Sequence, residues 1–179
     1  QKMQYDLGKI ETLLEGKYRP GHYQGVCQVV HRLLDIVQPN NLYLGQKDYQ
    51  QCMVITRLVE LMGKKEAIHI NICPTLREAD GLAMSSRNMR LNEEERKKSV
   101  LIFQSLSFIK DNIGSASIET LKNKANAMLT NEGFKVDYIE IADAKTLEPV
   151  RNWDGKKKLV ALAAAFLNEV RLIDNLLLN

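Results

Sequence analysis

The chain has 179 residues, of which 45% are hydrophobic and 26% are charged, so it can bury a core as one domain or as two small ones. Its 25 Lys and Arg residues nearly balance 22 Asp and Glu, and a net charge of +3 is too small to indicate nucleic-acid binding by itself. Aromatic residues make up only 6%, which provides no evident stacking surface for bases, and no apolar run approaches the ~18 residues of a membrane span.

The first predicted elements are a helix and a short strand. Residues 22–38 carry apolar side chains at helical spacing, with one face expected to be buried, and Pro39 and Asn40 end the pattern. A short apolar strand over 42–44 then leads into Gly45. The apolar positions of the helix are Val26, Val29, Val30, Leu33, Leu34 and Val37.

A second helix and a second strand follow. Asp48 is expected to cap a helix that runs to about Met62 and ends in a turn at Gly63. Residues 67–72 read as a strand, which Pro74 ends. A strand, a short helix and another strand form a βαβ unit, so the two strands are expected to be parallel. The residues of this helix expected to be buried are Cys52, Ile55, Leu58, Val59 and Met62.

Two parallel strands do not form a stable sheet alone. Parallel sheets are normally buried on both faces and built from several strands. Residues 1–75 are therefore interpreted as the C-terminal part of a larger doubly wound, Rossmann-like α/β domain.

Residues 76–179 predict a small α+β domain. Asn92 and Glu95 form a capping-box pattern before a helix that runs to about Asn112, and Ser117 begins another helix that ends at Gly133. Three extended segments then follow, and only two residues separate the last two, which predicts a tight hairpin. The expected architecture is two helices on a three-stranded antiparallel sheet. The extended segments are 136–142, 158–167 and 170–177, and the first helix carries a stripe of Ile102, Leu106, Ile109 and Ile113 before Gly114.

Polar residues follow the first strand at the point where α/β proteins bind ligands, beyond the carboxyl ends of the strands. Gly45 lacks a Cβ and lets a ligand approach the backbone, Lys47 offers an ammonium to phosphate oxygens, and Asp48 can accept hydrogen bonds from ribose hydroxyls. The same residues also suit a turn, a solvated charge and a helix cap. The pattern alone leaves both interpretations open.

A second polar group lies at residues 84–87. Met84 is followed by Ser85, Ser86 and Arg87, which supply two hydroxyls and a guanidinium suited to phosphate. Donors of this kind stabilise the charge that grows on a departing pyrophosphate. A polar surface loop is the alternative. The chain has no G-x-x-x-x-G-K-[ST] loop, which disfavours a P-loop ATPase.

Other polar residues give weaker signals. Gln51 near the start of the second helix can donate and accept hydrogen bonds, as a hydroxy acid would require, or can be a surface glutamine. The three histidines form neither a Ser-His-Asp arrangement nor a metal-ligand cluster, so no metal site in the protein is predicted. The three cysteines are widely spaced and odd in number, which is typical of reduced thiols in a cytoplasmic protein.

Four segments of the sequence resemble those of one family, the pantothenate synthetases or pantoate–β-alanine ligases. Together they extend the resemblance over nearly the whole chain. The longest match is the run PTLREADGLAMSSRN at residues 74–88. The others are RPGHYQGV at 19–26, GQKDYQQ at 45–51 and RLIDN at 171–175.

The resemblance implies a reaction and its substrates. The family condenses D-pantoate with β-alanine using ATP and Mg²⁺, through a pantoyl adenylate, and releases AMP and pyrophosphate. It also implies the family's nucleotidyltransferase fold and a homodimer for the intact enzyme. Small molecules are thus the expected partners, without nucleic acid or membrane.

Roles for individual residues come from the same resemblance. Lys47, Ser85, Ser86 and Arg87 match catalytic positions. ATP would be lined by Gly45, Gln46, Lys47, Asp48, Leu76, Met84, Ser85, Ser86 and Arg87, with adenine held by a backbone group at Leu76. Pantoate would be held by Gln51, with Val26, Val29 and Val30 along its dimethyl end, and Arg19 matches a basic position near the active site.

The chain departs from the family pattern in three ways. Gln46 replaces a glutamate, and Leu44 stands where an aromatic residue is common. The His-x-Gly-His motif and a second pantoate-binding glutamine do not occur in these residues, so the chain is expected to be the C-terminal portion of such an enzyme and inactive or nearly inactive alone. The alternative is a non-catalytic module that keeps an ATP half-site or a dimer surface. A synthetase-like protein acting on RNA is disfavoured by the charge and the aromatic content.

Overall fold

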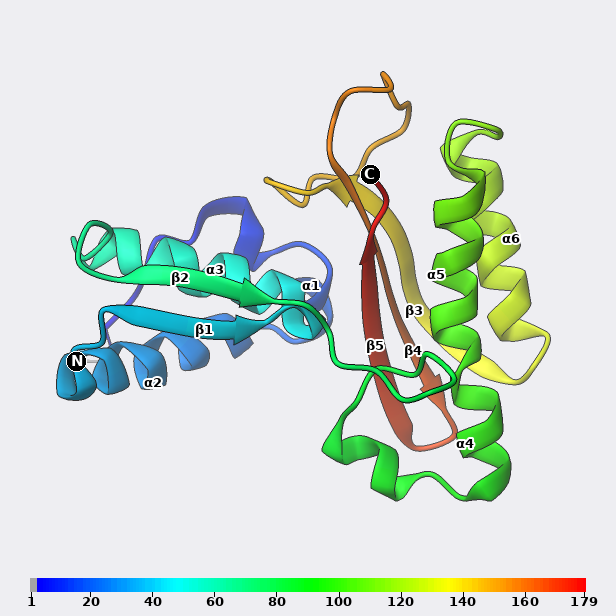
Figure 1. Cartoon of the computed structure of the whole chain (residues 1–179), viewed down its shortest axis with the longest axis horizontal. Coiled ribbons are helices and arrows are strands. Elements are labelled where there is room, and N and C mark those ends of the chain that lie inside the picture. The colour runs from blue at the N-terminus through cyan, green and yellow to red at the C-terminus, as the bar shows by residue number, and fades with distance from the viewer. Residues whose placement is uncertain (1–2) are drawn as a thin grey trace. The chain divides into compact units, whose positions relative to one another are not determined.

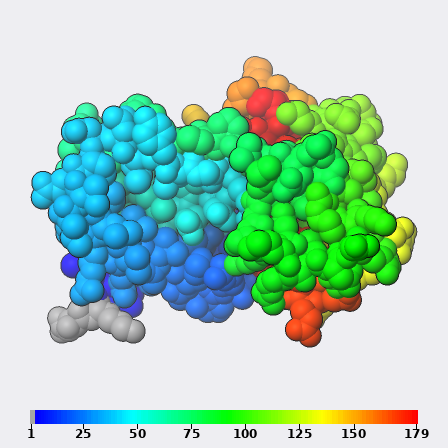
Figure 2. Space-filling view, turned by 60° about the horizontal axis from the view of Figure 1, so that its bottom comes forward, coloured from blue at the N-terminus to red at the C-terminus, as the bar shows by residue number. Residues whose placement is uncertain are grey.

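The computed structural model describes residues 3–179, which divide into two compact units, Gln1–Pro74 and Thr75–Asn179 (Figure 1). The division lies beside Thr75, where the sequence predicts a boundary. On the face shown in Figure 2, the green segment that follows this division forms much of the surface of the second unit. Each unit has its own hydrophobic core and is described by itself.

The first unit contains a two-stranded parallel sheet flanked by helices, as the βαβ pattern predicts. The pairing runs from Asn41 opposite His69 to Gly45 opposite Cys73, so the carboxyl ends of both strands lie at one edge. The elements of this unit are η1 (Gly8–Glu11), α1 (Glu15–Tyr18), α2 (His22–Val37), β1 (Asn41–Gly45), η2 (Gln46–Asp48), α3 (Tyr49–Leu61) and β2 (His69–Cys73).

The predicted burial of α2 is wrong for half of its apolar stripe. Val29 is 61% exposed, Leu33 is 53% exposed and Val37 is 66% exposed. α2 packs on α3 through a narrower face, in which Tyr23 and Cys27 meet α3 residues of one cluster while Leu34 meets those of another. Periodicity identifies the apolar stripe, but it does not show how much of that stripe has a neighbour to pack on. The α3 residues of these contacts are Val54, Leu58 and Val59.

The end of α3 follows the local sequence. Gly63 adopts φ +67°, a left-handed conformation that glycine reaches without strain, and its amide donates to the Glu60 carbonyl. The Lys64 amide donates to the Val59 carbonyl at 3.0 Å, which closes the last turn. The predicted turn at Gly63 is therefore confirmed.

The second unit has the predicted α+β architecture. Its antiparallel sheet has the order β3-β4-β5, and α5 and α6 pack on it around one large core. The core is lined on the sheet side by small residues of β4 such as Ala161, Ala163 and Ala165, which bring the helices close to the strand. The elements are η3 (Ser86–Arg90), α4 (Glu93–Ser99), α5 (Leu101–Asn112), α6 (Ile118–Thr130), β3 (Phe134–Asp143), β4 (Leu159–Leu167) and β5 (Val170–Leu177).

The single helix predicted up to Asn112 is two helices. The capping box is confirmed, because the Asn92 side chain accepts from the Glu95 amide and the Glu95 carboxylate accepts from the Asn92 amide. The break follows Ser99, a buried residue whose hydroxyl donates to the Arg96 carbonyl at 2.7 Å. Such a bond competes with the helical backbone pattern and bends helices. Spacing of apolar residues continues across the break and so does not reveal it.

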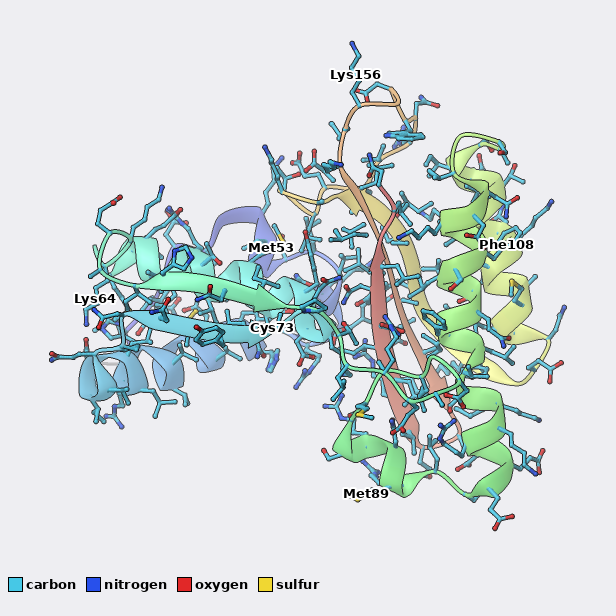
Figure 3. The ribbon with its side chains drawn as sticks, viewed as in Figure 1. Met53, Lys64, Cys73, Met89, Phe108 and Lys156 are labelled. Atoms are coloured by element: carbon cyan, nitrogen blue, oxygen red, sulfur yellow. The ribbon has the colours of Figure 1, made fainter. Side chains whose placement is uncertain are left out.

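The three thiols are expected to react at very different rates. Burial raises the pKa of the Cys27 and Cys52 thiols to about 11, whereas Cys73 at the end of β2 is exposed (Figure 3). Because the thiolate is the reactive form, a disulfide reagent at about pH 8 should modify Cys73 quickly. It should modify Cys27 and Cys52 only when the protein opens. Cys73→Ser should remove the fast phase, and three fast thiols would contradict the structure.

Among the described residues, no helix combines the length and apolar character needed to cross a membrane.

Candidate functional site

The edge where β1 and β2 end carries the first group of predicted site residues. Gly45 is the last residue of β1 and is extended, with φ −81°, and a Cβ built there would meet no atom within 4 Å. Its carbonyl accepts from the Cys52 thiol at 3.2 Å, which ties the strand end to α3. The backbone at Gly45 is therefore open to a ligand, as the sequence predicts for a residue without a Cβ.

Lys47 and Asp48 lie in η2, between this strand and α3. The Lys47 Nζ atom is 3.7 Å from the Asp48 Oδ1 atom, and the two side chains are 19% and 51% exposed. Asp48 occupies the predicted N-cap position before α3, but its side chain makes no capping hydrogen bond there. The carboxylate faces the ammonium instead. A cation and a carboxylate thus stand side by side at the open edge of the sheet, next to Gln46.

Gln50 has a structural role that the sequence does not predict, while its neighbour Gln51 is the predicted substrate contact. The Gln50 amide is 3% exposed, donates at 2.8 Å to the carbonyls of Ile10 and Leu13, and accepts from the Glu15 amide at 3.1 Å. Gln50 thereby fastens η1 and α1 to α3. Gln51 is half-buried and makes none of these contacts, so its side chain stays available to a ligand.

The three valines of α2 that are predicted to contact pantoate differ in exposure. Val26 and Val30 are partly buried and pack against the core formed by Leu7, Tyr23 and Leu58. Val29 is 61% exposed. One valine of the three is thus exposed for contact with an apolar group, and two support it from the core.

In the second unit, the segment before η3 folds back on itself as a narrow loop. The Met84 amide donates to the Leu76 carbonyl at 2.9 Å, and the Glu78 amide donates to the Leu82 carbonyl at 2.8 Å. Leu76 stands at the base of this loop with its side chain 70% exposed. Because its carbonyl already accepts one hydrogen bond, an adenine contact there would use the amide or the second lone pair of the carbonyl.

The residues predicted to bind phosphate follow this loop in the chain. Ser85 is extended, and its hydroxyl accepts from the Arg87 amide at 3.2 Å as the cap of η3, which begins at Ser86. The Arg87 side chain is exposed, and its guanidinium has neither a hydrogen bond nor an ion pair within residues 3–179. Met84 beside them is 41% exposed. Two hydroxyls and one uncommitted cation are therefore presented within three residues.

A carboxylate at the tip of the loop holds it to α4. The Asp80 carboxylate accepts from the Arg96 guanidinium at 2.7 Å and from the Leu82 amide at 3.1 Å. The hydrogen bond from Arg96 is the main reason that the pKa of Asp80 lies below its usual value. Asp80 is thus ionised and bonded at neutral pH.

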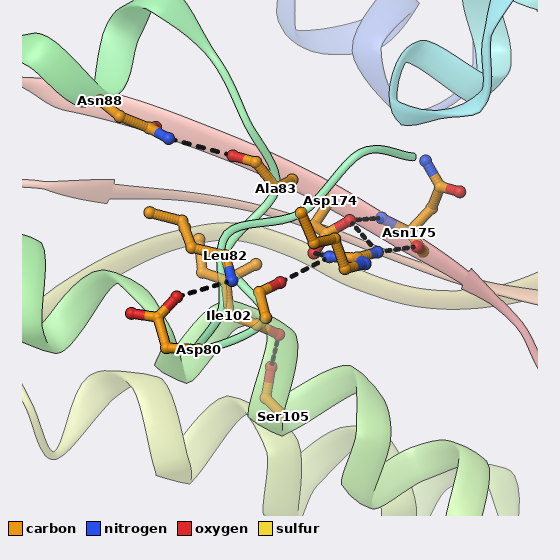
Figure 4. Close-up of polar contacts among 10 residues, drawn as sticks. Asp80, Leu82, Ala83, Asn88, Ile102, Ser105, Asp174 and Asn175 are labelled. Atoms are coloured by element: carbon orange, nitrogen blue, oxygen red, sulfur yellow. Dashed lines mark hydrogen bonds and ion pairs between the residues drawn. The ribbon is translucent and has the colours of Figure 1, made fainter. Parts of the chain in front are cut away.

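The sequence reasoning missed the residue that joins the loop to the sheet. Arg77 forms a two-pronged ion pair with Asp174, which lies on β5. Figure 4 shows Asp174 and Asn175 beside the loop that carries Asp80, Leu82 and Ala83. The available signal was Asp174 itself, because a carboxylate in the interior of a strand requires a partner where it is buried.

Mg²⁺ is the metal that the family resemblance implies. The described part of the chain holds no group of three or more His, Cys, Asp or Glu side chains that could bind a metal ion. Magnesium commonly reaches such proteins bound to the phosphates of ATP, with few protein ligands. The donors present suit a nucleotide that brings its own ion.

Comparison with known proteins agrees with the motifs. The profile described as Pantoate-beta-alanine ligase matches residues 2–177. Pantothenate synthetases of Azobacteroides pseudotrichonymphae genomovar. CFP2 and Bacteroides fragilis are 42% and 40% identical over 174 residues, with 97% of this chain and 61% of each relative covered. The chain thus spans about 61% of the length of these relatives.

Solved structures show the same fold. Pantothenate synthetase from Thermus thermophilus is 37% identical with a TM-score of 0.87, over 98% of this chain and 62% of that one. Pantoate–β-alanine ligase from Francisella tularensis, solved with beta-gamma ATP and β-alanine, is 37% identical with a TM-score of 0.71, over 95% of this chain and 56% of that one. The profile match and these relatives show that the chain belongs to the pantoate–β-alanine ligase family.

Proposed function

We propose that this protein condenses D-pantoate with β-alanine in an ATP-dependent reaction that releases AMP and pyrophosphate. The observation that carries the proposal is the 74–88 run, which folds as an anchored loop presenting Ser85, Ser86 and Arg87, in a chain that matches the family over residues 2–177. The Francisella relative solved with beta-gamma ATP and β-alanine supports the same substrates.

The proposed reaction has two steps. A carboxylate oxygen of pantoate attacks the α-phosphorus of ATP, a new phosphorus–oxygen bond forms, and the bond to the bridging oxygen breaks as pyrophosphate leaves. The amine of β-alanine, after losing a proton to solvent, then attacks the acyl carbon of pantoyl adenylate. The acyl–oxygen bond breaks, AMP leaves with its electron pair, and the amide of pantothenate forms.

The described residues suit the first step best. Negative charge grows on the departing pyrophosphate, and donors fixed in place stabilise that charge more than they stabilise bound ATP. Lys47 and Arg87 are proposed to bind phosphate oxygens, with Ser85 and Ser86 as hydroxyl donors. The remaining contacts proposed for ATP are Gly45, Gln46, Asp48 on ribose, Leu76 and Met84.

Pantoate is proposed to lie against Gln51 and the valines of α2. The half-buried amide of Gln51 suits the hydroxyl and carboxylate groups of pantoate, and the exposed Val29 suits its dimethyl carbon. Val26 and Val30 would complete the apolar contact from the edge of the core. Leu44 keeps this surface apolar, and Gln46 removes one negative charge near ATP. Mg·ATP is the proposed form of the nucleotide, in which Mg²⁺ neutralises phosphate charge.

Measurement of AMP formation tests the proposal. Protein expressed from its complete reading frame is expected to form AMP only when ATP, pantoate and β-alanine are all present. Exchange of labelled pyrophosphate into ATP should need pantoate but not β-alanine, because it reports the first step alone. Absence of both activities would refute the proposed function.

The 179 residues alone are proposed to turn over little or not at all. The His-x-Gly-His motif and the second glutamine that the resemblance implies are not among them, and loss of one charge-stabilising donor costs about 10²–10³ in rate. Turnover comparable with that of an intact relative would contradict this proposal.

A non-catalytic module that binds ATP or dimerises is the second candidate. The exposed apolar residues of α2 favour it, namely Val29, Leu33, Ile36 and Val37. Calorimetry with ATP and sizing by light scattering separate the two, since a monomer that binds no ATP would remove the second candidate. We also propose a homodimer for the active enzyme and a cytoplasmic location, the latter because all three thiols are unpaired.

A further inference from the structure

The Arg77 guanidinium joins three backbone segments of the second unit. Its Nη1 atom donates to the Asp174 Oδ2 atom at 2.6 Å and to the Gly81 carbonyl at 3.0 Å. Its Nη2 atom donates to the Asp174 Oδ1 atom at 2.9 Å and to the Asn175 carbonyl at 3.3 Å. One side chain therefore fixes its own strand of the loop, the tip of the loop and β5.

This ion pair is largely shielded from water. The Arg77 side chain is 18% exposed and the Asp174 side chain is 3% exposed. The guanidinium carbon lies 4.4 Å from the centre of the Phe103 ring on α5, which covers one face of the cation. Asp174 also accepts from the Asn175 amide at 2.8 Å. Lysine could not reproduce this arrangement, because an ammonium lacks the planar fork that matches both carboxylate oxygens.

Further contacts hold the tip of the same loop and the segment that follows it. Asp80 bonds to Arg96 of α4, and the Asn88 side-chain amide donates to the Ala83 carbonyl at 3.1 Å. The contacts of Arg77 lie before the Ser85–Arg87 stretch in the chain, and the contact of Asn88 lies after it. The stretch is therefore held on both sides. Its residues are the ones proposed to bind phosphate, and the Arg87 guanidinium itself has no partner in the described chain.

We propose that Arg77, through Asp174, is a positioning residue that sets the placement of Ser85, Ser86 and Arg87 for pantoyl adenylate formation. This inference rests on the proposed function and adds residues that touch no substrate. A displacement of about 1 Å in a reacting site can cost about 10²-fold in rate, so a loop released from β5 would act mainly on the step that uses phosphate contacts.

The test separates positioning from stability by measuring the two half-reactions. Pyrophosphate exchange with ATP and pantoate reports the first step, and consumption of supplied pantoyl adenylate with β-alanine reports the second. For Arg77→Lys in the protein from its complete reading frame, we expect the first step to slow about 10- to 100-fold while the second changes less than about threefold. A variant that is only partly folded would instead lose both rates by the same factor.

Two further variants sharpen the result. In the double variant Arg77→Leu with Asp174→Leu, apolar side chains replace the buried pair, a change that often leaves stability intact. Its first step should nevertheless stay slow, and a wild-type rate would overturn the proposal. Arg171→Lys is the matched control, since Arg171 also bonds to a carboxylate, that of Asp137 at 2.8 Å, in the same unit and is 15% exposed. That control should keep both half-reactions near the wild-type rate.

The possible outcomes remain distinct. A wild-type protein without either half-reaction refutes the proposed function. An active wild type with an Arg77→Lys variant that keeps its first-step rate, or loses both rates equally, refutes the positioning role alone. If the double variant does not fold, Arg77→Lys with its melting temperature still decides the matter.

Discussion

Replacing Lys47 by alanine is expected to lower the rate of pantoyl adenylate formation by about 10²–10³-fold. Lys47 stands at the open edge of the parallel sheet with its ammonium 3.7 Å from Asp48, and it is proposed to bind the phosphates of ATP. Loss of the cation would leave the charge that grows on pyrophosphate without one of its fixed partners. Pyrophosphate exchange in the presence of pantoate measures this step directly.

Two controls accompany Lys47→Ala. Lys47→Arg keeps the charge and should recover part of the rate, because arginine also binds phosphate but with a different reach. Lys65→Ala removes a lysine whose side chain is 71% exposed and should leave the rate unchanged. Equal rates for Lys47→Ala and the wild type would show that Lys47 is only a surface charge.

Replacing Gly81 by alanine is expected to lower the free energy of unfolding of the second unit by about 2–5 kcal/mol. Gly81 has φ +97°, which strains any residue with a Cβ, and the added Cβ would lie 2.2 Å from the Phe103 Cδ1 atom. The Phe103 ring has little freedom to move, because the Arg77 guanidinium rests on it. Denaturant unfolding followed by circular dichroism measures the change.

A glycine in the same unit separates the two causes. Gly133 has φ +90° but nothing within 4 Å of a built Cβ, so Gly133→Ala should cost only the backbone strain of about 1–3 kcal/mol. In a double variant with Phe103→Ala, the part of the Gly81→Ala loss caused by the clash should disappear, giving a coupling of about 0.5–3 kcal/mol. Full additivity of the two substitutions would argue against a contact between them.

Some of the correctly predicted parts of the fold depend on residues close together in the chain. The capping box of Asn92 and Glu95 and the turn at Gly63 are complete within a few residues, so the sequence shows them directly. The exposed half of α2 and the break after Ser99 were missed for a different reason. The exposure of α2 depends on what lies next to the helix in space, and the break after Ser99 accompanies a side-chain hydrogen bond to the Arg96 carbonyl. Apolar spacing records neither feature.

For the candidate site too, the sequence shows local features but not contacts between distant residues. The sequence places Asp48 correctly at the N-cap of α3, but it does not show that the side chain makes no capping bond there. The roles proposed for Lys47 and Arg87 stay predictions. Gln50 and Gln51 are adjacent and chemically identical, and only the folded chain shows that Gln50 is committed to the backbone of η1 and α1. The pair of Arg77 and Asp174 spans 97 positions, a separation that no local pattern encodes.

That separation also has a consequence for synthesis of the protein. A ribosome translates the whole 74–88 loop well before it reaches Asp174, because 97 positions separate Arg77 from this anchor. Contacts of such long range form late and slow folding. During that interval Arg77 is a solvated cation without its carboxylate partner. The loop therefore acquires its final shape only when β5 closes the sheet, which makes the placement of Ser85, Ser86 and Arg87, the residues proposed to bind phosphate, a late event in folding.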